Sequence, residues 1–202
     1  MTTDQQRVAV VTGAARGIGA GVARRLAADG MAVAVLDLDE SACGPLVEEI
    51  TAAGGRALAV GADVSDEERE LLQRLADLRH HRVGTVDVLV NNAGLSNLGP
   101  VAQADPDAEL GVVEVDIAAV VDLTTRFLPG IVARGGGAIL NVASTAAFQP
   151  LPLQALYGGA KAFVLSYTEA LSEELRGTGV SATALCPGPT RTEFAAAAGT
   201  DN

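Results

Sequence analysis

The stretch that most constrains this chain is a glycine-containing segment at residues 12–19, Thr-Gly-Ala-Ala-Arg-Gly-Ile-Gly. The apolar run at residues 8–11 precedes it and indicates a short buried strand, and residues 20–28 after it have helical composition and spacing. A strand, a glycine turn and a helix in that order aim backbone N–H groups and the positive end of a helix dipole at one point. The segment therefore predicts a place where a phosphate group can bind.

Each glycine of the segment has a physical reason to be there. Gly13 can take a positive φ in the tight turn, while Gly17 and Gly19 allow the backbone to approach a ligand and the helix to pack closely on the strand. The spacing is G-x-x-x-G-x-G, whereas the commoner dinucleotide fingerprint is G-x-G-x-x-G. By itself the cluster is also compatible with an ordinary left-handed turn.

Length and composition narrow the class of protein. The 202 residues are enough for one α/β domain with a substantial core, and we expect residues 1–202 to form a single domain. A net charge of −11 argues against a nucleic-acid partner and against an anionic membrane surface. Cys43 and Cys186 form no C-x-x-C pair, which favours a reducing, cytoplasmic location. We expect neither a membrane span nor a signal peptide, because no apolar run reaches about 18 residues and no cleavage site precedes the glycine turn.

An acidic residue ends the second expected strand, at residues 32–36. This residue, Asp37, stands where a dinucleotide-binding fold hydrogen-bonds the adenosine ribose hydroxyls. Its carboxylate would repel a 2′-phosphate and so favours NAD over NADP, whereas the Arg16 guanidinium could pair with that phosphate. We give Asp37 the greater weight. A plain turn residue is the other interpretation of Asp37.

The remaining expected elements alternate between helix and strand. Helices are expected over residues 41–53, with Ser41 as the N-cap, and over 67–79, 106–133 and 155–175; strands are expected over 56–60, 86–90, 138–143 and 180–185. This alternation predicts a doubly wound parallel sheet between two helical layers, with strand order 3-2-1-4-5-6. His80 and His81 end the second of these helices, but adjacent histidines point in different directions, so no metal site is expected.

A serine, a tyrosine and a lysine near the end of the chain can carry acid–base chemistry. Ser144 follows an expected strand, and Tyr157 and Lys161 lie one helical turn apart on one helix face. A free tyrosine titrates at about pH 10, so a tyrosine base near neutral pH needs about 4 kcal/mol of phenolate stabilisation. An ammonium group about 4 Å away supplies energy of that order at an effective dielectric of about 20. Y-x-x-x-K also arises by chance in helices, so the serine at the matching spacing is needed to strengthen the hypothesis.

Together, the segment at residues 12–19, the turn Asn91-Asn92-Ala93-Gly94 and the spacing S-x12-Y-x-x-x-K resemble the short-chain dehydrogenase/reductase family. The resemblance runs from residue 7 to about residue 194. It implies a Rossmann-like fold, NAD or NADP as cofactor, and hydride transfer between nicotinamide and a secondary alcohol or ketone. Tyr157 would be the general acid/base and Ser144 would hold the substrate oxygen.

The resemblance also implies a set of cofactor-binding residues. Those residues are Gly13, Arg16, Gly17, Ile18, Gly19, Asp37, Asp63, Val64, Asn91, Ala93, Gly94, Tyr157, Lys161, Pro187, Gly188, Thr190 and Thr192. Asp63 and Val64 are expected at the adenine ring, although Asp63 is also placed as the acidic residue of a helix N-terminus. Residues 187–192 resemble the loop on the nicotinamide side. Asparagine side chains in the 91–94 turn can also have a structural role, because they can satisfy backbone groups between neighbouring strands.

One position departs from the family pattern. Asp116 stands where the family usually places an asparagine that anchors a water leading to the catalytic lysine. We expect its carboxylate to pair with Lys161 and to offset part of the positive field that acts on Tyr157. The enzyme would then be less active or work best at higher pH.

The end of the chain carries a second expectation. Family members usually continue through a helical segment that covers the substrate and a seventh strand, so we expect this chain to lack both and its last strand to be a sheet edge. The helices expected over 106–133 and 155–175 resemble those that pair family members, which predicts a homodimer or homotetramer. The alternative to an enzyme that acts on alcohols and ketones is a remnant of this family that binds the nucleotide. Such a protein would have weak activity or none and would act through assembly.

Overall fold

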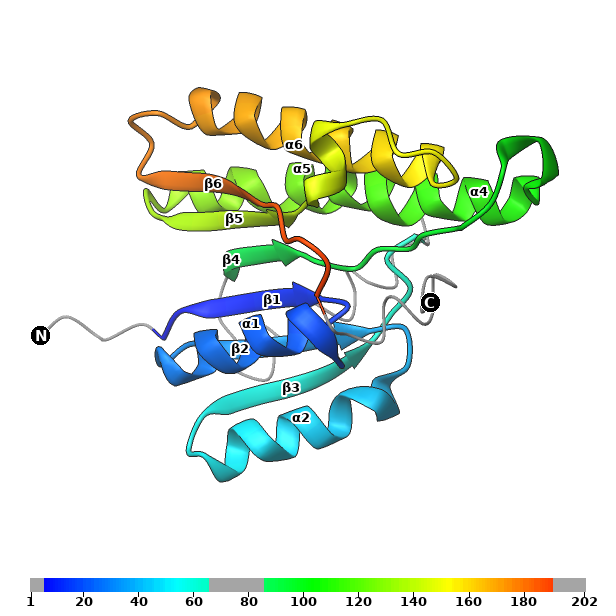
Figure 1. Cartoon of the computed structure of the whole chain (residues 1–202). Coiled ribbons are helices and arrows are strands. Elements are labelled where there is room, and N and C mark those ends of the chain that lie inside the picture. The colour runs from blue at the N-terminus through cyan, green and yellow to red at the C-terminus, as the bar shows by residue number, and fades with distance from the viewer. Residues whose placement is uncertain (1–5, 66–85, 191–202) are drawn as a thin grey trace, which may run out of the picture.

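A parallel six-stranded sheet forms the centre of the computed structural model, which describes residues 6–65 and 86–190. The strands are β1 (Val8–Thr12), β2 (Ala32–Asp37), β3 (Arg56–Gly61), β4 (Val86–Asn91), β5 (Gly137–Val142) and β6 (Val180–Leu185). Their order is β3-β2-β1-β4-β5-β6, and all neighbouring pairs are parallel (Figure 1). This confirms the predicted doubly wound sheet and its strand order. In the described part of the chain, β6 is an edge strand.

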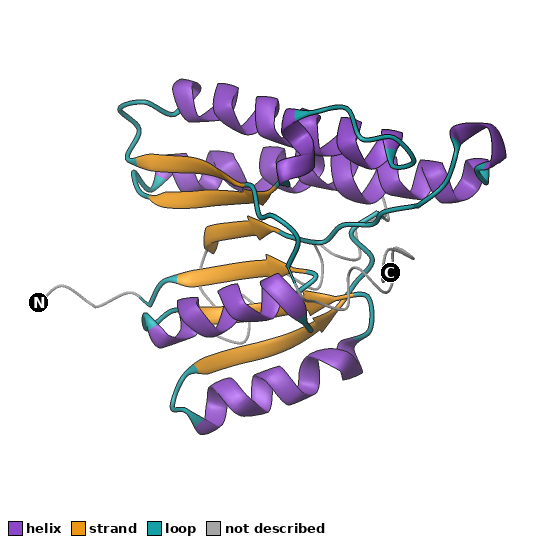
Figure 2. Cartoon of the chain, in the orientation of Figure 1, coloured by secondary structure: helices purple, strands orange, loops and turns teal. Residues whose placement is uncertain are grey.

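Helices cover both faces of the sheet (Figure 2). The helical elements are α1 (Gly17–Ala28), α2 (Glu40–Ala52), α4 (Pro106–Val113), η2 (Glu114–Ala118), α5 (Ala119–Ala133) and α6 (Ala155–Glu174), with short 3-10 turns at η1 (Val101–Gln103) and η3 (Thr145–Phe148). Helices α1 and α2 pack against β1, β2 and β3, while α5 and α6 pack against β4, β5 and β6. The helix expected over 67–79, with His80 and His81, lies outside the described residues.

The inner strands β1 and β2 read as continuous apolar runs because both of their faces are buried. Val10 and Leu89 face α5 and α6 within one apolar cluster, which also contains Ile139. Val11 and Val90 point to the opposite face, where they pack with side chains of α1 and α2. The alternation of side chains along each strand thus builds two cores from one sheet. Because β1 pairs in parallel with β2 and β4, the carboxyl ends of these three strands lie at the same edge of the sheet.

One local expectation was wrong, and another becomes more specific. The cap of α2 is Asp39, whose Oδ1 accepts the Ser41 N–H at 2.8 Å, because Asp39 has the extended backbone of an N-cap and Ser41 already lies inside the helix. The mostly helical stretch expected over 106–133 is confirmed, and it consists of α4 and α5 joined by η2, a π-helical turn with i→i+5 bonding. Helical periodicity alone does not show such a turn.

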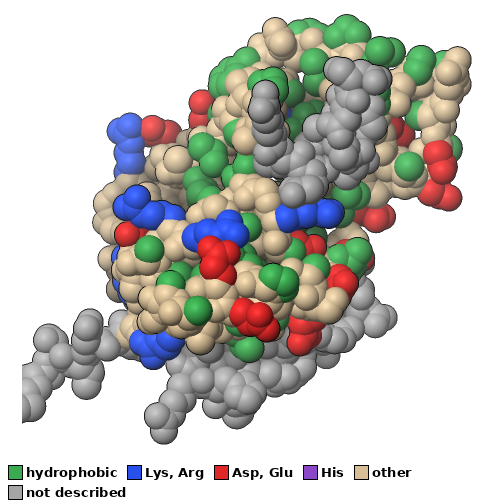
Figure 3. All heavy atoms as spheres, turned by 60° about the horizontal axis from the view of Figure 1, so that its bottom comes forward, with side chains coloured by type: hydrophobic (Ala, Val, Ile, Leu, Met, Phe, Trp, Pro, Cys, Tyr) green, Lys and Arg blue, Asp and Glu red, His purple; other side chains and the backbone are tan. Residues whose placement is uncertain are grey.

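The surface over α1 and α2 carries charges of both signs. Figure 3 shows Lys and Arg side chains interspersed with Asp and Glu on this face. Arg24 on α1 forms two hydrogen bonds of 2.8 Å with Glu49 on α2. No helix in the described part of the chain has the length and apolar character needed to cross a membrane.

Candidate active site

The glycine turn joins β1 to α1 and depends on the small size of its residues. Gly13 and Gly17 have φ values of 59° and 57°, a backbone conformation that glycine adopts readily. The positive φ at Gly13 confirms the prediction. A Cβ atom on Gly19 would overlap the Gly13 carbonyl oxygen and would lie 2.5 Å from the Asn92 Nδ2 atom. A side chain at position 19 would therefore push the turn away from β4.

The first turn of α1 differs from those of α2 and α4. Asp39 caps α2 and Asp105 caps α4, each by accepting a backbone N–H. At α1 the N-cap is Arg16, which makes no side-chain cap bond, and no acidic residue lies in the first turn. The backbone N–H groups of Gly17, Ile18 and Gly19 thus combine with the positive helix dipole without a capping carboxylate, which suits an anionic ligand.

Asn92 braces the glycine turn from the neighbouring strand. Its Nδ2 atom donates to the carbonyl oxygens of Thr12 and Gly13, both at 2.9 Å. The Thr12 hydroxyl oxygen accepts the N–H groups of Asn92 and Ala93, both at 3.0 Å. The expected bonding of asparagine side chains to backbone groups between strands is confirmed at Asn92. Asn92 is not among the cofactor-binding residues that the resemblance implies, and its role here is the structural one expected of the 91–94 turn.

Asp37 ends β2 beside the same turn. Its Oδ2 atom accepts the Ala15 N–H at 3.0 Å, and its Oδ1 atom accepts the Leu38 N–H at 2.9 Å. The carboxylate is therefore held against the glycine turn, while the Arg16 side chain is exposed. The structure brings Asp37 and the glycines together, as the sequence predicted.

A small surface hollow lies at the carboxyl ends of β1 and β4. It is lined by Thr12, Val64, Asn91, Ala93, Val115, Ala119, Val120 and Leu123. The buried Asn91 Oδ1 atom accepts no hydrogen bond from the described residues, while its Nδ2 atom donates to Thr124 and Asn141. Asp63 is exposed and accepts both the N–H and the hydroxyl of Ser65. These two bonds form a local turn at Asp63. The contact of Asp63 with adenine stays a prediction.

Lys161 and Tyr157 lie one turn apart on α6. Lys161 is only 5% exposed, and its Nζ atom donates to the Val142 carbonyl oxygen at 3.1 Å. The same Nζ atom lies 5.6 Å from the centre of the Tyr157 ring. The spacing expected from the sequence therefore does place the ammonium group beside the aromatic ring.

Ser144 and the loop after β6 complete this end of the sheet. Ser144 is the N-cap of η3, and its Oγ atom accepts the Ala146 N–H at 3.1 Å. The next residue donates its N–H to the Pro187 carbonyl oxygen at 3.0 Å, which holds the loop against η3. Thr190 donates its hydroxyl to the Gly188 carbonyl oxygen at 2.9 Å. Thr192 lies outside the described residues.

Asp116 is fully buried within η2. Its Oδ1 atom accepts the Leu95 N–H at 2.6 Å, and its Oδ2 atom lies 2.9 Å from the Lys161 Nζ atom. Burial raises the pKa of the Asp116 carboxyl, and the Lys161 charge partly counteracts that rise. A Cβ atom on Gly94 would lie 3.2 Å from Asp116 Oδ2 and 3.3 Å from Lys161 Nζ, so glycine allows the backbone to pass close to the pair. The expected pairing with Lys161 is confirmed.

The model of the short chain dehydrogenase family matches residues 7–202. The chain belongs to this family. A short chain dehydrogenase from Pseudocercospora fijiensis is 37% identical over 194 residues, which cover 95% of this chain and 62% of that protein. The chain spans 62% to 67% of the length of three curated relatives that it matches.

Solved short-chain dehydrogenases share the fold. A structure from Burkholderia phymatum in complex with NAD has a TM-score of 0.88 and 32% identity, over 98% of this chain and 70% of that one. One from Sphingobium yanoikuyae in complex with NADPH has a TM-score of 0.86 and 30% identity, over 96% and 75% of the two chains.

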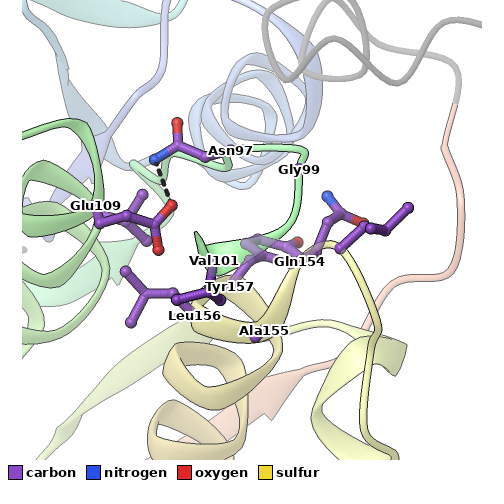
Figure 4. A pocket seen from close by; sticks show the side chains of 10 residues that line it. Asn97, Gly99, Val101, Glu109, Gln154, Ala155, Leu156 and Tyr157 are labelled. Atoms are coloured by element: carbon purple, nitrogen blue, oxygen red, sulfur yellow. Dashed lines mark hydrogen bonds between the residues drawn. The ribbon is translucent and has the colours of Figure 1, made fainter. Parts of the chain in front are cut away.

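This short-chain dehydrogenase has a second hollow beside Tyr157 (Figure 4). Its lining residues are Asn97, Gly99, Val101, Glu109, Val112, Leu153, Gln154, Ala155, Leu156 and Tyr157. None of these except Tyr157 was predicted as a site residue. The polar ones come from a loop, from α4 and from the residue before α6, so only the fold brings them together. In the sequence, Glu109 is indistinguishable from an ordinary acidic residue in the first turn of a helix.

Proposed function

We propose that this chain is an NAD(P)-dependent oxidoreductase that interconverts a secondary alcohol and a ketone. The observation that carries the proposal is the buried Lys161 ammonium beside the Tyr157 ring, at the same edge of the sheet as the glycine turn. A nicotinamide cofactor supplies or accepts the hydride when it is bound. The protein must then supply a proton donor or acceptor and the orientation of the substrate.

The cofactor proposal rests on the fit of the residues to a dinucleotide. Glycine at positions 13 and 19 lets the turn pack directly against Asn92 and Ala93, and the first turn of α1 offers N–H groups to a pyrophosphate. Asp37 would bind the adenosine ribose hydroxyls, and we give NAD more weight than NADP for that reason. The remaining residues of the predicted cofactor set would contact the adenine, the riboses and the nicotinamide.

Tyr157 would exchange the proton with the substrate oxygen, and Ser144 would hold that oxygen by a hydrogen bond. The Lys161 ammonium would stabilise the phenolate of Tyr157 and bind the nicotinamide ribose hydroxyls. Asp116 would act as a positioning residue, because its carboxylate holds the Nζ atom and offsets part of its charge. We expect this to move the pH optimum upward compared with an otherwise identical enzyme without the carboxylate.

The test separates nucleotide binding from catalysis. NADH and NADPH are titrated by fluorescence, and a panel of secondary alcohols and ketones is followed at the nicotinamide absorbance. The proposal expects turnover by the natural chain, and at least a 100-fold loss of kcat in Tyr157→Phe with unchanged cofactor affinity. Binding without turnover would contradict the proposal and support a nucleotide-binding protein that acts through assembly.

The remaining parts of the proposal concern assembly and location. A homodimer or homotetramer would form through the outer faces of α5 and α6, in the cytoplasm. On α6, Phe163 is 37% exposed and stacks on Tyr167 with ring centres 5.7 Å apart. Light scattering on the purified chain measures the mass, and a monomer at micromolar concentration would contradict this part.

A further inference from the structure

The charge around the hollow beside Tyr157 points to a class of substrate. Among its described lining residues, Glu109 is the one ionisable side chain besides Tyr157. The lining contains the amides of Asn97 and Gln154 and otherwise apolar side chains or backbone, and no Lys or Arg belongs to the described lining. A negative charge on a bound molecule would therefore face a carboxylate without a neighbouring cation to offset it.

Hydrogen bonds from Asn97 hold the Glu109 side chain and the backbone beside it in place. The Asn97 Nδ2 atom donates to its Oε1 atom at 3.2 Å and to the Ala108 carbonyl oxygen at 2.9 Å. These bonds connect the loop after β4 with α4, and Figure 4 shows the Glu109 carboxylate and the Asn97 amide facing each other at one side of the hollow. Since the side chain is only half-buried, its carboxylate can meet both this amide and a molecule in the hollow.

The opposite wall is held by bonds of its own. The Gln154 Nε2 atom donates to the Ser96 hydroxyl at 2.8 Å, and the Gly99 N–H donates to the Leu153 carbonyl oxygen at 2.8 Å. These two bonds join the residues before α6 to the loop that carries Asn97. The separation between Tyr157 and Glu109 is thus set by the fold before a ligand arrives, which lowers the cost of selecting one end group over another.

We infer that Glu109 is a specificity-determining residue that selects substrates carrying a hydroxyl or ammonium group, and no negative charge, at the end away from the reacting carbon. The inference rests on the proposed function, because it takes Tyr157 as the group that meets the reacting oxygen. A carboxylate accepts hydrogen bonds from hydroxyl and ammonium groups, and it repels a second carboxylate in a partly desolvated hollow. The net charge of −11 adds a long-range repulsion of anions.

The test uses three secondary alcohols that differ only in one end group: butane-1,3-diol, 4-aminobutan-2-ol and 3-hydroxybutanoate. With saturating NAD, kcat/KM for the diol and for the amine should exceed that for the acid by about tenfold or more. Glu109→Gln should shrink this preference by about tenfold, with the diol changed by less than about threefold. Glu109→Lys should favour the acid. Asp107→Asn is the matched control, because Asp107 is an exposed carboxylate on the same helix outside the lining.

A binding measurement keeps this inference separate from the proposed function. Saturation-transfer NMR with NADH present ranks the binding of the three probes without turnover. If no probe is oxidised but the amine still binds best and loses that advantage in Glu109→Gln, the function fails and the selectivity stands. A preference for the acid, or equal ratios in the natural chain and Glu109→Gln by both measurements, would overturn the inference. Thermal unfolding of each variant shows that it is folded.

Discussion

Two buried polar clusters lie on the same side of the sheet, and they differ in charge. The amide ladder consists of Asn91, Thr124, Asn141 and Thr168, which are between 0% and 4% exposed. In it the Asn91 Nδ2 atom donates to Asn141 Oδ1 at 2.8 Å, and the Asn141 Nδ2 atom donates to the Thr168 hydroxyl at 2.9 Å. The charged pair is Asp116 with Lys161, at 2.9 Å and equally buried. One cluster is neutral and spans β4, β5, α5 and α6; the other is ionic and adjoins Tyr157.

Because one cluster is neutral and the other is charged, their contributions to stability and to the reaction can be measured separately. Each neutral hydrogen bond of the ladder contributes about 1 kcal/mol, and an unpaired partner costs about 1–3 kcal/mol. A buried ion pair often adds no net stability, because desolvation of the two charges offsets their attraction. We therefore expect the ladder to hold sheet and helices together, and the charged pair to matter mainly for the reaction at Tyr157.

The largest effect is expected when Lys161, one partner of the charged pair, is replaced by a neutral residue. Lys161→Met leaves the Asp116 carboxyl buried without its partner and should lower the free energy of unfolding by about 3–5 kcal/mol. It should also reduce kcat by at least about 100-fold. Adding Asp116→Asn should restore part of the stability and none of the activity, as measured by urea unfolding and by initial rates. If Lys161→Met and the double variant were equally stable, the unpaired Asp116 carboxyl would not be the cause of the lost stability. The proposed distinction between the two clusters would then fail.

The second largest effect is expected when hydrogen bonds of the amide ladder are removed. Asn141→Leu removes the acceptor of the Asn91 amide and the donor to the Thr168 hydroxyl, so the free energy of unfolding should fall by about 1–3 kcal/mol. The kcat of the folded protein should stay within about twofold, because the ladder carries no charge toward Tyr157. Thr125→Val on the exposed face of α5 is the control and should change stability by less than about 0.5 kcal/mol. A large loss of kcat would show that the ladder also serves the reaction.

A smaller effect is expected when the pair loses only its negative charge. Asp116→Asn keeps a similar shape and exposes Tyr157 to the full field of Lys161, so the midpoint of the pH–rate profile should move by roughly one unit toward acid. Asp122→Asn, at an exposed position paired with Arg126, is the control and should leave the profile in place. An unchanged profile in Asp116→Asn would mean that its carboxylate does not act on Tyr157.

The smallest effect concerns stability as a function of pH. Because burial raises the pKa of Asp116, the folded chain binds this proton more tightly than the unfolded chain does. The contribution to stability is fully present below the unfolded pKa, about 3.9, and is lost as the pH rises through the folded pKa. Urea unfolding across this range should show a fall that Asp116→Asn lacks. The same slope in both proteins would contradict the assignment to Asp116.

Much of the fold was predictable because it follows from local alternation. Apolar runs of strand length, separated by amphipathic helices, indicate a parallel sheet. The order 3-2-1-4-5-6 is the one that doubly wound dinucleotide-binding folds adopt. The pairing of Asp116 with Lys161 was also predictable, because it needs only one departure from a family pattern. The roles of the candidate site residues in binding and catalysis stay predictions.

Other features depend on tertiary contacts and could not be read from the sequence. Glu109 lines the hollow beside Tyr157 only because the loop after β4 returns to α4. The Asp39 cap depends on where the backbone first becomes helical, which propensity places within a residue or two. The π-helical turn leaves no trace in the periodicity of α4 and α5.

That turn has a consequence for how this protein can change. A π-helical turn is an α-helix with one residue inserted, so a chain that lost one residue from η2 could join α4 and α5 without rotating either helix about its axis. If the lost residue were Asp116, Lys161 would lose its ionic neighbour while the helices on either side kept their orientation. The ionic neighbour of Lys161 therefore stands in a turn where the chain can gain or lose a residue without rotating the helices on either side.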